Sequence, residues 1–63
     1  MSLDVFGKNW DSEHGFTYEE AVIKKAAVDE AHGVGMPGSC WNPAVIQPDL
    51  DRKDGYKVII TSK

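Results

Sequence analysis

Apolar and polar residues recur with helical spacing in one stretch of the first half of the chain. Just before this stretch, Thr17 and Glu20 stand three residues apart, the spacing of a capping box in which each side chain accepts a hydrogen bond from the other residue's backbone. Gly33 follows the stretch, and glycine adopts the left-handed conformation that ends many helices. The pattern therefore predicts a helix of about four turns that begins at Tyr18 and ends at residue 31 or 32.

The apolar side chains of this helix do not form one clean stripe. At about 100° per residue, one group of four shares a face that we expect to pack on a sheet: Val22, Ile23, Ala26 and Ala27. Ala21 and Val28 project to nearly the opposite side. They are either exposed, covered by the N-terminal segment, or part of a second contact surface for another subunit or a target.

Two short runs near the C-terminus are rich in β-branched residues, as strands are. They span residues 44–47 and 56–61, and the Asp54-Gly55 pair between them is typical of a turn. Prolines flank the first run, which suits an edge strand because proline has no N–H to pair. We therefore expect a β-hairpin in which the second run is central and residues 44–47 form an open sheet edge. In the second run, one face is expected to lie under the helix: Tyr56, Val58 and Ile60.

Residues 3–6 supply a third strand in one interpretation, and in the other the N-terminal segment with Trp10 crosses the helix as an irregular arm. With the strand, the order is β-α-β-β. A strand, a crossover helix and a parallel strand then leave a gap that the C-terminal strand fills. We expect an α+β fold, a single small domain over residues 1–63 with one helix packed on a three-stranded sheet.

The chain has 63 residues, so its hydrophobic core is small and its stability marginal. Its single cysteine, Cys40, forms no intramolecular disulfide, and a secreted domain of this size usually carries several. The N-terminus shows no targeting signal, and no stretch approaches the roughly 18 apolar residues of a membrane span. We expect a cytoplasmic protein that gains stability from a partner.

Charge argues against direct binding to nucleic acid. Seven acidic and three basic residues lie in residues 1–31, against three and four in residues 32–63. The one basic cluster, Arg52, Lys53 and Lys57, is interrupted by acids, whereas nucleic-acid binding needs a basic stripe. The acidic half leaves open a weak mimic of nucleic acid, although a solvated surface is the simpler interpretation.

Two local motifs resemble ligand sites without matching them in full, and the spacing of a zinc site is absent. Residues 33–38 match the spacing G-x-G-x-x-G, yet a helix precedes them where a dinucleotide site needs a strand, so we expect a helix-to-strand loop. Residues 49–55 fail the calcium-loop pattern at its required positions and are interpreted as a solvated turn. No paired Cys or His spacing indicates zinc. We expect no metal and no cofactor.

Cys40 is the only candidate nucleophile of the thiol type, and His14 and His32 are the only candidate histidine bases. Neither histidine lies at a sequence spacing from Cys40 that implies contact. We therefore expect a buried, inert thiol and two surface histidines. A small enzyme subunit or thiol-dependent redox protein that uses Cys40 with a histidine stays as the alternative function.

Three aromatic residues, Phe6, Trp10 and Phe16, lie in the first sixteen positions. We expect two in the core and Trp10, which lies in a polar run, as an exposed anchor. In the absence of a catalytic set we expect a small non-catalytic, accessory, regulatory or inhibitory protein that docks on a larger protein or self-associates. The residues expected to bind the partner are Trp10, Ala21, Val28, Trp41 and Val45.

Overall fold

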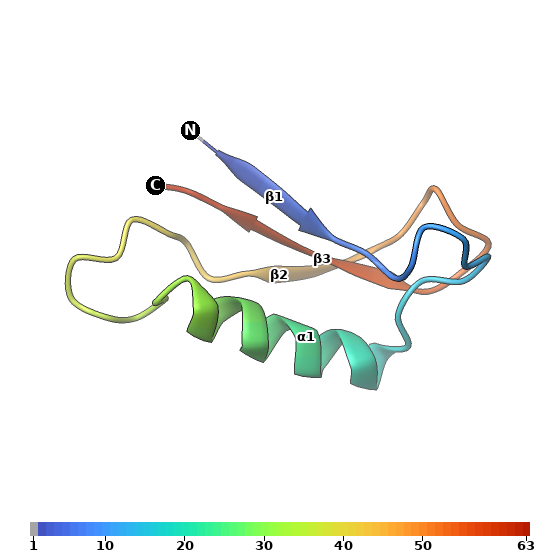
Figure 1. Ribbon diagram of the computed structural model, residues 1–63, viewed down its shortest axis with the longest axis horizontal. Coiled ribbons are helices and arrows are strands. Elements are labelled where there is room, and N and C mark those ends of the chain that lie inside the picture. Colours follow the sequence, from blue (N-terminus) through green and yellow to red (C-terminus); the bar gives the residue numbers. More distant parts are fainter. Residues whose placement is uncertain (1) are drawn as a thin grey trace.

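One helix packs on one face of a three-stranded antiparallel sheet (Figure 1). The computed structural model describes residues 2–63. The elements follow one another as β1 (Leu3–Phe6), α1 (Tyr18–Ala31), β2 (Val45–Pro48) and β3 (Tyr56–Thr61). The sheet order is β1-β3-β2, with β3 antiparallel to both neighbours. The α+β fold, the strand order and the central place of β3 are confirmed, and residues 3–6 form the strand and not an irregular arm.

Both ends of α1 are fixed by local hydrogen bonds. The hydroxyl of Thr17 accepts from the Glu20 N–H at 3.2 Å, and the Glu20 carboxylate accepts from the Thr17 N–H at 3.0 Å, which completes the capping box. At the other end Gly33 has a φ of 68°. The N–H groups of Gly33 and Val34 donate to carbonyls of the last turn at 3.1 and 2.9 Å, which is the Schellman arrangement. Both predicted helix boundaries are confirmed.

The buried face of α1 is the one that the sequence pattern did not select. Ala21 and Val28 are 0% and 4% exposed, whereas Ile23 is 71% exposed. The expectation that the Val22 and Ile23 face packs on the sheet was therefore wrong, and Ala21 and Val28 lie in the core instead. Half-buried charged side chains, Lys25 among them, share the inner face. The aliphatic parts of such side chains cover apolar surface while their charged groups reach solvent. A sequence pattern that counts them as polar therefore assigns this face to the outside.

The core lies between this helix face and the inner face of β3. Val58 and Ile60 are its largest fully buried side chains, and Ala44 closes it beside β2. A ring of partly buried residues surrounds this cluster: Phe6, Phe16, Val34, Trp41, Ile46 and Tyr56. The expected inner face of residues 56–61 is confirmed, and so is the division of the N-terminal aromatics, because Trp10 is 92% exposed.

The strand β2 is displaced by one residue from the expected 44–47. The N–H of Ala44 donates to the Asp29 carboxylate at 2.8 Å, so this residue is tied to α1 and the strand begins after it. Pro48 still pairs with Tyr56 in the register of the sheet. Its missing N–H costs nothing there, because that position faces away from β3.

Candidate protein-binding surface

The face of the sheet opposite α1 carries no second layer within residues 2–63 (Figure 1). Side chains alternate along a strand, and this places Leu3, Val5, Val45 and Ile59 on that face. The register sets Val5 and Val45 directly on either side of Ile59. Leu3, Val5 and Val45 are 60%, 51% and 45% exposed. An apolar row therefore crosses all three strands in contact with solvent.

Trp10 extends this row beyond the strands. It lies in the loop after β1 and is 92% exposed. With Val5 and Lys57 it lines a shallow hollow of about 270 Å³, so the indole and the sheet face border the same depression. We call Leu3, Val5, Trp10, Val45 and Ile59 together the outer sheet surface.

The loop that carries Trp10 is held in place by Arg52. Its guanidinium donates to the carbonyls of Lys8 and Ser12, each at 2.7 Å, and to that of Asn9 at 2.8 Å. Its Nε lies 2.9 Å from the Asp49 carboxylate. Asp49 is 7% exposed, but Leu50, Asp51, Lys53 and Asp54 are exposed, so residues 49–55 are the expected solvated turn with one buried carboxylate. They form a clasp between the hairpin loop and the N-terminal loop.

Two further contacts fix the same loop against α1 and β3. The Lys8 ammonium lies 3.1 Å from the Glu20 carboxylate. The hydrogen bond from the Thr17 N–H, and then the bond from Lys8, lower the pKa of Glu20 below its ordinary value. Further along, Gly15 meets Gly55 so closely that a Cβ on Gly55 would come within 2.7 Å of the Gly15 backbone. The exposed indole is therefore attached to a tightly anchored segment.

The structure separates the five residues that were expected to bind a partner. Trp10 and Val45 belong to the outer sheet surface. Ala21 and Val28 are buried in the core, so their predicted contact role was wrong. Trp41 is half-buried on the opposite side of the sheet, where its ring centroid lies 4.6 Å from that of His32.

Leu3, Val5 and Ile59 are surface residues that the sequence reasoning did not select. They could have been found from the alternation of side chains along the strands, together with the fact that the sequence predicts only one helix. One helix covers one face of a sheet, so the opposite alternate positions stay exposed unless a partner covers them.

The thiol and the two histidines do not form a catalytic group. Cys40 is exposed, so the expectation of a buried thiol was wrong. His14 Nδ1 lies 2.6 Å from the Asp54 carboxylate, and His32 Nδ1 lies 2.8 Å from the Val28 carbonyl. His32 is half-buried and not a surface residue as expected. Within residues 2–63 no hydrogen bond joins the thiol to either ring.

In the described part of the chain, neither the glycine-rich stretch nor the acidic residues form a recognisable ligand-binding site. Gly33, Gly35 and Gly38 adopt positive φ values of 68°, 83° and 82° in a loop between α1 and β2, as the helix-to-strand interpretation predicts. No three His, Cys, Asp or Glu side chains in the described part of the chain gather as metal ligands would. None of the helical segments in that part is both long and apolar enough to span a membrane.

Asp29 links the helix to the sheet through its carboxylate. One oxygen accepts the Ala44 N–H at 2.8 Å and the other lies 2.8 Å from the Lys25 ammonium. Burial raises the pKa of Asp29, but the hydrogen bonds from Lys25 and Ala44 outweigh it and lower the pKa below the ordinary 3.8. The carboxylate therefore stays ionised where it ties the start of β2 to the last turns of α1.

Comparison of the chain with protein-family models, with curated proteins and with solved structures gives no match.

Proposed function

We propose that the chain is a small, non-catalytic protein-binding module that docks on a larger protein through the outer sheet surface. The observation that carries this proposal is the solvent-exposed apolar row Val5, Ile59 and Val45, continued by Trp10. Contiguous apolar patches on small soluble domains mark interaction sites more often than isolated apolar residues do. The role we propose is accessory, regulatory or inhibitory, in the cytoplasm, where a domain with a single cysteine needs no disulfide framework.

The arrangement of charges around the row supports docking on a protein. Interfaces combine an apolar centre with a polar rim, and here Lys57, Asp51 and Arg52 border the hollow beside Trp10. Tryptophan is also enriched among the residues that dominate binding energy. Because the Arg52 clasp holds the loop in position, little conformational entropy is lost when the indole is buried against a partner.

The test is a crosslinking experiment in the cells that express the chain. A photoreactive aromatic amino acid replaces Trp10, and crosslinked proteins are identified with and without excess unlabelled chain. Competition by Val5→Thr/Val45→Thr, which keeps β-branched side chains while making the row polar, should be at least tenfold weaker than competition by wild type.

The matched control is Val22→Thr/Ile23→Thr, which makes two exposed residues of α1 on the opposite side of the molecule polar. It should compete as wild type does. Equal competition by both double variants, with both shown to be folded by circular dichroism, contradicts docking through the outer sheet surface.

A thiol-dependent activity is the second candidate, and the exposure of Cys40 favours it. Rapid alkylation of the native thiol near neutral pH, with an acid-shifted pH profile, would support this function, because a reactive cysteine needs a stabilised thiolate. Alkylation at the rate of a free cysteine in an unfolded peptide would contradict it.

A further inference from the structure

Both β1 and β2 are edge strands of the sheet, and the alternation of hydrogen bonds along the strands shows that β1 leaves more N–H groups free. The Ser62 N–H donates to the Ser2 carbonyl at 2.9 Å, so this pair is a hydrogen-bonded one. Hydrogen-bonded and non-hydrogen-bonded pairs alternate along two antiparallel strands, so the pairs Asp4–Ile60 and Phe6–Val58 are hydrogen-bonded as well. Residues 4 and 6 therefore direct their N–H and C=O groups at β3, whereas Leu3 and Val5 direct theirs away from the sheet.

The other edge strand, β2, offers fewer free N–H donors. Thr61, an odd-numbered residue, uses its carbonyl to accept the Asn42 N–H at 2.9 Å, which shows that the odd positions of β3 face β2. Ala44, Ile46 and Pro48 then face outward. The Ala44 N–H is bound by Asp29 and Pro48 has none, so only Ile46 offers a donor within β2. Residues 44–47 lie at an edge of the sheet as expected, but this edge offers fewer free donors than β1 does.

We propose that β1 pairs antiparallel with β1 of a second copy of this chain, with the two Val5 residues opposite each other. Only odd residues present free backbone groups, so the pairing joins odd to odd. Centring the pair on Asp4 would set two carboxylates directly opposite each other, which is destabilising. Centring it on Val5 instead sets Asp4 of each copy opposite Phe6 of the other.

Charge complementarity favours this register. The Lys24 ammonium lies 5.4 Å from the centroid of the Phe6 ring, and no carboxylate in the described residues lies within ion-pair distance of it. Directly opposed residues of a non-hydrogen-bonded pair are close, with Cα atoms about 4.5 Å apart. Asp4 of the second copy therefore arrives beside Phe6 and within reach of this ammonium, and the symmetry repeats the contact.

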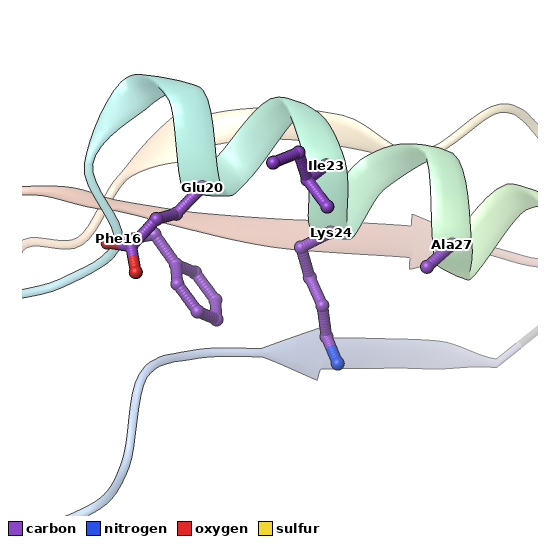
Figure 2. Close-up of a pocket in the computed structure, with 5 residues that line it drawn as sticks. All are labelled: Phe16, Glu20, Ile23, Lys24 and Ala27. Carbon is purple, nitrogen blue, oxygen red and sulfur yellow. The ribbon is translucent and has the colours of Figure 1, made fainter.

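The space beside the open edge also fits an added strand. The helix packs on β3 and β2, and β1 is contacted only by side chains from α1 and its C-cap, Lys24 over the Phe6 ring and His32 at 3.6 Å from the Asp4 carboxylate. A hollow of about 360 Å³ lies along the helix on this side, lined by Phe16, Glu20, Ile23, Lys24 and Ala27. Figure 2 shows the Lys24 side chain extending from α1 toward β1, beside the Phe16 ring. The helix-facing side chains of an added strand would enter this hollow.

Disulfide trapping tests the register. Opposed residues of a hydrogen-bonded pair have Cα atoms about 5.5 Å apart, within the range that a disulfide bridges. Val5→Cys/Cys40→Ser should oxidise to a covalent dimer at least tenfold faster than Val45→Cys/Cys40→Ser, whose cysteine is similarly exposed but distant from the pairing edge. Equal rates would overturn the proposed register.

Amide exchange and sedimentation test the pairing in the unmodified chain. With rising concentration, the Leu3 and Val5 amides should become at least tenfold more protected, while the Ile46 amide does not. A monomer at all concentrations up to the millimolar range overturns the proposal, as does a dimer with Leu3 and Val5 unprotected.

Exchange of the two charges provides an independent test. Asp4→Lys and Lys24→Asp should each weaken the dimer at least tenfold, and the double variant should recover most of the loss. Failure of the double variant to recover would overturn the assigned contact. The inference concerns the edge of the sheet and not its face, so its failure leaves docking through the outer sheet surface intact, and the reverse also holds.

Discussion

Replacing Arg52 by alanine removes the group that joins the two loops at one end of the sheet. In the folded chain the guanidinium binds three backbone carbonyls between 2.7 and 2.8 Å and the Asp49 carboxylate at 2.9 Å. The side chains of Arg52 and Asp49 are 15% and 6% exposed. Arg52→Ala therefore leaves a buried carboxylate without its cation and three carbonyls without their donor.

The carboxylate dominates the expected loss of stability. Asn9 is exposed and Lys8 and Ser12 are half-buried, so water replaces the lost bonds to these carbonyls in part. Removing one member of a buried ion pair costs about 3–5 kcal/mol. A domain of this size rarely has more than about 3–5 kcal/mol of stability in total. Arg52→Ala should therefore be largely unfolded at 25 °C.

Urea denaturation followed by circular dichroism measures this loss, with Lys53→Ala as the control. Lys53 is the exposed neighbour, so its replacement should change stability by less than about 0.5 kcal/mol. The double variant Asp49→Asn/Arg52→Ala should recover part of the lost stability, because its residue 49 is neutral and no buried charge is left unpaired. A change below about 1 kcal/mol for Arg52→Ala would refute the role assigned to the clasp.

Three further outcomes follow from the core, the helix and the turn. Ala21→Leu should destabilise by about 1–3 kcal/mol through overpacking, whereas Ile23→Ala should stay within about 0.5 kcal/mol; equal effects in thermal melts would mean that the helix face is misassigned. Because the folded pKa of Asp29 is depressed, its contribution is present above the ordinary value of 3.8 and is lost as pH falls through the folded value. Asp29→Asn should thus be less stable near neutral pH, and the difference should shrink as acidity increases; a constant difference would contradict this link. Gly55→Ala places a Cβ 2.7 Å from the Gly15 backbone at a φ of 97° and should cost more than about 1 kcal/mol in urea titration; a neutral result would mean that the two segments separate easily.

The parts of the fold that local chemistry determines were predictable. Thr17, Glu20 and Gly33 define the ends of α1 within a few residues of sequence, and the β-branched runs define β2 and β3. The inner face of α1 was missed because long-range packing decides it. Ala21 and Val28 share that face with Lys25, whose stem contributes apolar surface while its charge pairs with a carboxylate.

The candidate site was predictable to a similar degree. Trp10 stands out as an aromatic residue among polar neighbours, and strand alternation places Val45 correctly. The clasp was not predictable, because Arg52 binds carbonyls roughly forty positions away in sequence and only the folded backbone brings them together. The difference between the two sheet edges was likewise hidden, since it depends on Asp29 reaching the Ala44 N–H.

That last contact limits how far the chain can assemble. A sheet with two open edges recruits copies on both sides and grows into a fibre. Here Asp29 and Pro48 leave β2 with a single free donor, so the strand addition that we propose at β1 is disfavoured at β2, and assembly should end when two copies have met. Asp29→Ala would free the Ala44 N–H and reopen the second edge. In the proposed dimer, the carboxylate of Asp29 would therefore separate a closed pair from an open polymer.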